Sequence, residues 1–200
     1  RPISEEAAMA ALQTRRPRAP DPCPDAHAVV DFWRASARNW FFGDARFDRL
    51  FRDRFLALHR AVVAGRCDDW LATPEGALAL VILTDQFPRN AFRGRPRMYA
   101  SDPLARRHAR AALEAGHLDA VDRDLRLFFC LPFAHSETLS DQDLSVALHA
   151  GRLGDPWLSH ARGHRDIIRR FGRFPHRNAI LGRPSTPDQA AFLQSGGFSG

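Results

Sequence analysis

The chain has 200 residues, of which 44% are hydrophobic and 26% are charged, values that are ordinary for a globular protein. All 29 basic residues are arginines, and they are interleaved with 23 acidic residues, so the net charge is only +6. Because the arginines form no dense stripe and no nucleic-acid-binding module, nucleic acid is not expected as a partner. The longest apolar run, 78–83, is too short to cross a membrane, so no membrane span is expected.

Three cysteines, Cys23, Cys67 and Cys130, lie far apart and lack the spacing of a metal site. An odd number of cysteines without an apolar secretion signal is typical of a cytoplasmic protein. We therefore expect reduced thiols, a cytoplasmic location, and neither a metal nor another cofactor.

The organisation of the chain changes near residue 25. Residues 1–24 are expected to be a Pro- and Arg-rich tail, because four prolines between 17 and 24 prevent a continuous helix. Residues 25–200 are predicted to form a single all-helical domain, since apolar residues recur at steps of three and four and no stretch alternates with a period of two. Short connections predict antiparallel hairpins of about eight helices without a sheet, at 25–37, 45–64, 74–87, 103–115, 121–131, 141–150, 156–171 and 187–194.

Four of these starts combine a capping residue with a following proline. The side chain of a capping residue accepts from free backbone amides, and proline lacks an amide that would be unpaired there. The four pairs are Thr73-Pro74, Asp102-Pro103, Asp155-Pro156 and Thr186-Pro187.

A segment at 87–96 recurs at 174–184 with one inserted histidine. One interpretation is a helix stop, in which proline ends the helix and asparagine forms a tight turn. That interpretation leaves Arg89 and Arg177 unexplained, because arginine is suited to binding carboxylate or phosphate. An internal acid such as Asp85 or Glu137 could equally pair with these arginines and clamp the segments to the core.

Three segments together are similar to a known family. They are 85–90 (DQFPRN), 135–137 (HSE) and 171–178 (FGRFPHRN), and they resemble the signatures of the bacterial domain-of-unknown-function family 924. The resemblance covers about residues 27–195. It implies an all-α fold similar to tetratricopeptide-type helical repeats, although the spacing shows no 34-residue repeat, and it implies no established function.

The leading functional hypothesis is a site for a small anionic molecule, a phosphate or a carboxylate, formed where these segments meet. Proton transfer favours groups that titrate near the working pH, and histidine does so. The candidate acid–base residues are Asp85, His135 and Glu137. The candidate ligand-binding residues are Gln86, Arg89, Asn90, Arg173, His176, Arg177 and Asn178. Whether the chain is an enzyme stays open, with hydrolysis as the first reaction class to test.

The alternative is a helical scaffold that binds a protein partner, with the same polar motifs acting as internal clamps. In that case adjacent exposed aromatic residues, such as those at 40–42, mark the partner surface. A metal site of His135, Glu137 and His176 is a minor possibility, because their spacing matches no zinc motif.

Overall fold

The structure is a computed structural model that describes Cys23 and residues 25–198, and every regular element within these residues is helical. The all-α prediction is confirmed, and each of the eight expected helices has a counterpart. The expected tail at 1–24 lies outside the described residues except for Cys23. The α-helices are α2 (Ala26–Ala35), α3 (Ala45–Val63), α4 (Pro74–Val81), α5 (Phe87–Ala91), α6 (Asp102–Glu114), α7 (His117–Ala120), α8 (Arg123–Ala134), α9 (Leu139–Arg152), α10 (Trp157–Phe171), α11 (Asn178–Leu181) and α12 (Pro187–Gln194).

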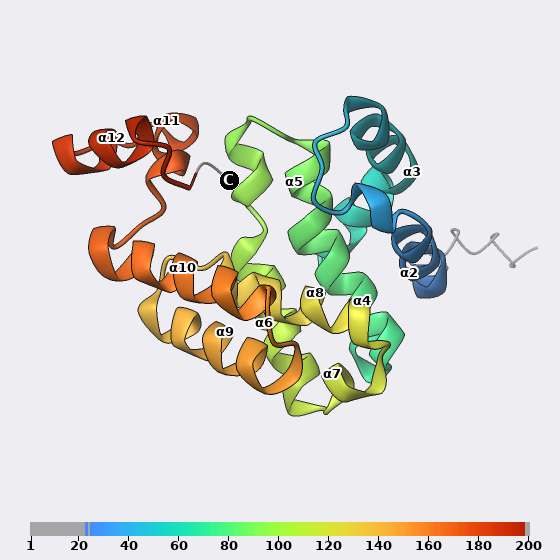
Figure 1. Cartoon of the computed structure of the whole chain (residues 1–200). Helices are drawn as coiled ribbons and strands as arrows, with labels where there is room; N and C mark the ends of the chain where they lie inside the picture. The colour runs from blue at the N-terminus through green and yellow to red at the C-terminus, as the bar shows by residue number, and fades with distance from the viewer. Residues whose placement is uncertain (1–22, 24, 199–200) are drawn as a thin grey trace, which may run out of the picture.

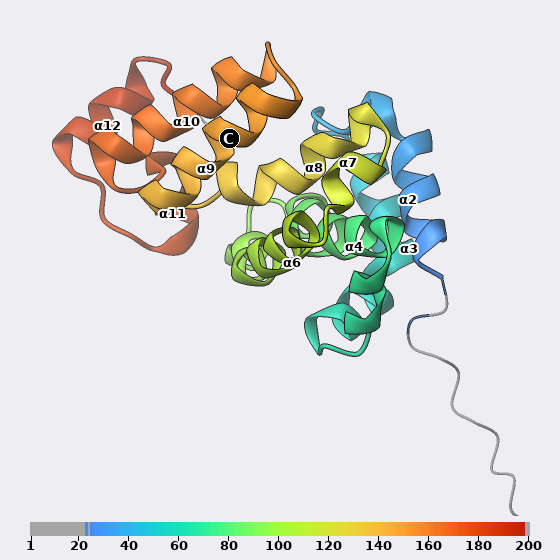
Figure 2. The same ribbon diagram turned by 90° about the horizontal axis from the view of Figure 1, so that it is seen from below.

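Helices α2, α6, α7 and α8 pack around the apolar helix α4. Helix α9 packs against both α8 and α10. Two perpendicular views place α10 to α12 at one end and α2 with α3 at the other (Figure 1, Figure 2). Residues 76–81 of α4 are all buried, because the sequence around them is almost entirely apolar.

Aromatic side chains fill much of the core beside α4. Trp33, on α2, is completely buried and lies with its ring centroid 5.4 Å from Phe51 of α3 and 5.2 Å from Phe128 of α8. Such ring pairs add to the stabilisation from buried area. The three helices therefore share one aromatic contact, which fixes α8 relative to the N-terminal pair.

Two of the four expected caps are confirmed. Thr73 accepts from an amide of the first turn of α4, and Thr186 forms a capping box with Gln189. Asp155 accepts from the amide of Ser159, although α10 begins two residues after it. The cap expected at Asp102 is wrong, because its carboxylate turns away from the helix start and pairs with arginine.

The first copy of the repeated segment is helical, so its interpretation as a helix stop and tight turn is wrong. Helix α4 passes directly into a π-helical segment (Ile82–Gln86) and then into α5, with Pro88 in the first turn of α5. The π segment changes the hydrogen-bond register just before Pro88, which has no amide to donate. As a consequence, Asp85 and Arg89 share one helical face, and Gln86 and Asn90 share another.

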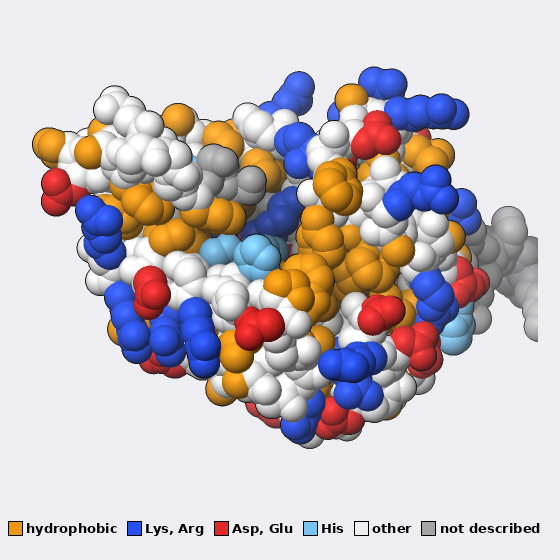
Figure 3. Space-filling model, viewed as in Figure 1, with side chains coloured by type: hydrophobic (Ala, Val, Ile, Leu, Met, Phe, Trp, Pro, Cys, Tyr) orange, Lys and Arg blue, Asp and Glu red, His pale blue; other side chains and the backbone are white. Residues whose placement is uncertain are grey.

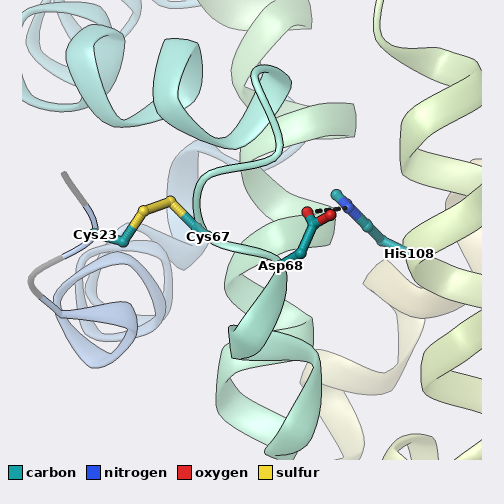
Figure 4. Close-up of a disulfide and its surroundings, with 4 residues drawn as sticks. All are labelled: Cys23, Cys67, Asp68 and His108. Carbon is teal, nitrogen blue, oxygen red and sulfur yellow. Dashed lines mark ion pairs between the residues drawn. A yellow bond between two sulfur atoms is a disulfide. The ribbon is translucent and has the colours of Figure 1, made fainter.

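Cys23 and Cys67 form a disulfide, so the expectation of reduced thiols is wrong for this pair (Figure 4). Their Cα atoms are 5.6 Å apart, an ordinary separation for such a bond. The sequence could not show this, because 44 positions separate the two residues. The cytoplasmic location, which was expected from the odd number of cysteines and the lack of a secretion signal, stays a prediction. None of the described helices combines the length and apolar character that a membrane span needs.

Candidate functional site

A cavity of about 630 Å³ opens between the segment 40–43, the C-terminal part of the α4–α5 run, and α10. Figure 3 looks onto this side of the molecule, where histidine side chains lie in a hollow with arginine behind them and hydrophobic side chains beside them. Its volume is in the range of small-molecule sites. Four of the ten candidate residues line it, namely Gln86, Arg89, Asn90 and His135.

The helical run through α5 positions three of these four. The side-chain amide of Asn90 donates to the carbonyl of Gln86, one turn earlier, at 2.8 Å. Arg89 lies one turn after Asp85, with their charged atoms 3.2 Å apart. His135 approaches from the end of α8, so residues 50 positions apart meet at one point.

Asp85 and His135 form a buried dyad. His135 Nδ1 donates to Asp85 Oδ1 at 2.8 Å, and Gln86 Nε2 donates to the other carboxylate oxygen at 2.6 Å. Asp85 is fully buried, whereas His135 retains some exposure at the cavity. His135 Nε2 has no hydrogen-bond partner among the described residues and is not an enclosed atom, so it opens into the cavity.

The charges of the dyad follow from its surroundings. Burial opposes the ionisation of Asp85, but Arg89, His135 and Gln86 outweigh it and lower the pKa of Asp85 to about 2. Burial and the charge of Arg89 outweigh the attraction of Asp85 and lower the pKa of His135 below its ordinary value. At neutral pH the pair is therefore a carboxylate and a neutral imidazole, whose Nε2 can accept a proton.

Behind the cavity, Asp102 joins the two arginines of the repeated segments. Arg89 donates to both oxygens of Asp102 at 2.9 and 3.1 Å, and Arg177 Nη1 lies 3.7 Å from the same carboxylate. Arg177 also donates to the backbone carbonyl of His135 at 2.8 Å and lies between the rings of Tyr99 and Phe174, 4.6 Å from each centroid. Arg177 is thus buried beneath His135 and does not line the cavity.

A second ion pair lies outside the cavity and holds the C-terminal segments together. Arg183 donates to both oxygens of Glu137 at 2.7 and 2.9 Å, and Glu137 Oε1 also accepts from the amide of Phe174. Burial disfavours the charge of Glu137, but these bonds prevail and lower its pKa. Asn178 joins the clamp, since it accepts from Arg183 and donates to Gln189.

The last two candidates contribute to neither group. Arg173 makes no ion pair with another described residue. His176 packs between Phe174 and Phe198, and burial lowers the pKa of His176 to about 4. The described part of the chain holds no group of three metal-ligand side chains placed to bind one ion, so His135, Glu137 and His176 are not assembled as a metal site.

Sequence reasoning missed several residues of the cavity and its support. Arg93, His149, His160 and His164 line the cavity, and Asp102 supports it from behind. The recurrence of histidine in α9 and α10 was a usable signal, because His160 and His164 lie one turn apart on one face. Asp102 had no such signal, since its position before proline reads equally well as a cap.

Comparison with known families and structures gives relatives without an established function. Residues 29–197 match the family described as bacterial protein of unknown function (DUF924). A solved structure of a protein of unknown function from Agrobacterium tumefaciens is 50% identical, with a TM-score of 0.83, and the match covers 85% of this chain and 97% of that one. No curated protein matches the chain. The chain belongs to the DUF924 family.

Proposed function

We propose that the cavity binds a small anionic molecule and that His135 acts on it as a general acid–base group. The observation that carries this proposal is the Asp85–His135 hydrogen bond of 2.8 Å, with the free imidazole nitrogen facing the cavity. A carboxylate that fixes one histidine nitrogen leaves the other in a defined tautomer as a proton acceptor.

The charges around the cavity support an anionic ligand. Among the described residues that line it, the two arginines, Arg89 and Arg93, are the permanently charged side chains, and none is Asp or Glu. Arg93 bonds to Asp48 and Asn90 through Nε and Nη2, which leaves Nη1 free on a side chain that is 48% exposed. Arg89 is more strongly compensated by acids, so Arg93 is the stronger candidate for a direct contact with a phosphate or carboxylate.

Hydrolysis is the reaction class that this geometry supports best. Neutral His135 accepts a proton from water through Nε2 while the water oxygen attacks the phosphorus or carbonyl carbon of a bound ester, and the bond from that atom to the leaving oxygen breaks. The adjacent carboxylate of Asp85 stabilises the imidazolium that forms, and His135 then returns the proton to the leaving group.

A protein-binding helical-repeat scaffold is the second candidate. Phe41 and Phe42 support it, because they are 51% and 72% exposed at the edge of the cavity. Exposed aromatic neighbours are common at protein interfaces. Binding of a protein partner needs no free nitrogen on His135. This candidate therefore predicts that the Asp85–His135 dyad is dispensable for binding the partner.

Binding of methyl phosphate and of acetate is measured by calorimetry, and turnover is measured with p-nitrophenyl phosphate, which carries an anionic group. Arg93→Ala is expected to weaken binding of the anionic probe at least tenfold, whereas Arg38→Ala, an exposed arginine outside the cavity, leaves it unchanged. His135→Asn is expected to retain binding but lose turnover, with exposed His27→Asn as the matched control. Unchanged affinity in Arg93→Ala rejects the anion site, and unchanged turnover in His135→Asn removes His135 from the reaction.

A further inference from the structure

The lining of the cavity combines polar and aromatic side chains. Arg93 and His135 are among the polar ones, and Trp40, Phe41, Phe42 and Trp157 form an aromatic rim. A ligand recognised by its charge alone would leave this rim without a role.

Contacts with the core hold Trp40, one residue of the rim, in place. Trp40 donates from Nε1 to the carbonyl of Trp33 at 2.7 Å, and its ring lies 4.8 Å from the ring of Phe128 in the core. Because Trp40 is anchored inward, the two residues that follow it cannot both turn into the core. The ring of Phe41 lies 5.1 Å from that of Trp157 and 6.5 Å from that of Phe128, but Phe41 stays half exposed, and Phe42 is largely in water.

The exposure of Phe41 and Phe42 to water is unfavourable, and a ligand that covers these rings would remove the penalty. Leaving aromatic surface in water forgoes the stabilisation that burial provides, and adjacent exposed aromatics usually mark a binding surface. The rings of Phe41 and Trp157 already pack on each other, so they lose little conformational freedom when a flat group stacks on them. The rim therefore suits a planar apolar group rather than a flexible chain.

We infer that the ligand is an aromatic anion whose ring system packs on the rim at Phe41, Phe42 and Trp157 while its phosphate or carboxylate lies toward Arg93. This inference rests on the proposed function and narrows its substrate class. Both parts of such a molecule fit within about 630 Å³, since drug-sized ligands occupy sites of this size. A small molecule is favoured over a protein partner because the rim continues into a cavity that ends at the buried dyad.

The test compares 1-naphthyl phosphate with methyl phosphate, two monoesters with the same charged group, by isothermal titration calorimetry. We expect the naphthyl ester to bind at least tenfold more tightly. Trp157→Ala is expected to reduce this preference at least fivefold while the affinity for methyl phosphate stays the same. Phe42→Ala gives the same test at a more exposed position, which keeps the inference falsifiable where Trp157→Ala does not fold.

Leu139→Ala is the control, because Leu139 is an exposed apolar residue outside the cavity, and it should leave both affinities unchanged. Equal affinities of the wild type for the two esters overturn the aromatic inference and leave the anion site standing. A naphthyl preference that survives both Trp157→Ala and Phe42→Ala also overturns it. Absence of binding by both esters overturns the proposed function together with this inference.

Discussion

Replacing Asp102 by Asn tests whether the buried charges hold the structure together. Asp102 lies in a cluster of two acids, Asp85 and Asp102, and two arginines, Arg89 and Arg177. The side chains of Asp102 and Arg177 are each only 8% exposed. Because Asn has nearly the same size as Asp, the substitution removes a charge without opening a cavity.

The expected effect follows from the charge that remains. After Asp102→Asn, Arg89 keeps its ion pair with Asp85 but loses its bidentate bond, and the buried Arg177 loses its ion pair. Breaking a buried pair by removing one partner costs about 3–5 kcal/mol, because an uncompensated charge stays behind. Since domains are stable by only about 5–15 kcal/mol, this loss is a large fraction of the free energy of unfolding.

Urea unfolding followed by circular dichroism measures this difference. We expect a lower midpoint with an unchanged slope, because the surface exposed on unfolding does not change. Asp31→Asn is the control: Asp31 pairs with Arg34 at 3.2 Å, but its side chain is 72% exposed, so the expected loss is under about 0.5 kcal/mol. A loss for Asp102→Asn below about 1 kcal/mol, or equal to that of the control, would refute the reasoning.

Three further predictions concern stability. Burial lowers the pKa of His164 to about 3, so the folded state favours its neutral form. The contribution of His164 to the free energy of unfolding is therefore complete above pH 6.5 and falls by up to ~1.4 kcal/mol per pH unit as the pH drops toward 3. Thermal melts between pH 3 and 6.5 should show a smaller change of melting temperature with pH in His164→Asn than in the wild type. Reduction of the disulfide, or Cys23→Ser, removes the cross-link between Cys23 and Cys67, which are 44 positions apart, and should lower the free energy of unfolding by about 2–4 kcal/mol. An unchanged melting temperature under reductant would contradict this. Glu137→Gln should speed hydrogen exchange at the amide of Phe174, which donates to Glu137 Oε1, and equal exchange would show that the clamp is not closed in solution.

The sequence predicts the long helices well because their periodicity is local. Helix α3 matches its expected range to within one residue, and α12 matches at both ends. The helix stop predicted at Pro88 was wrong although it also concerns a local feature. It depends on a change of the helical hydrogen-bond register that no single residue encodes. A proline after an apolar helix reads as a stop unless the preceding turn is known to be π-helical.

The contacts between segments could not be predicted, because tertiary packing determines them. The two copies of the repeated segment look alike and both arginines lie within 4 Å of Asp102, yet their hydrogen bonds differ: Arg89 donates to Asp102, whereas Arg177 donates to the carbonyl of His135. The later arginines differ too, since Arg183 pairs with Glu137 while Arg95, its counterpart, is exposed. Similar sequences therefore did not imply similar contacts, and the duplicated motif is not a duplicated site.

The clamp and the small-molecule site, which the sequence presented as alternatives, involve different atoms around one histidine. Asp85 fixes the side chain of His135, Arg177 holds its backbone carbonyl, and Glu137, two residues later, is tied to Arg183. Each of these bonds restrains His135 from a different direction and leaves Nε2 free. If His135 acts as the proposed acid–base group, the buried ion pairs are the means of its preorganisation, because a proton acceptor is effective only when its orientation is fixed before the ligand arrives.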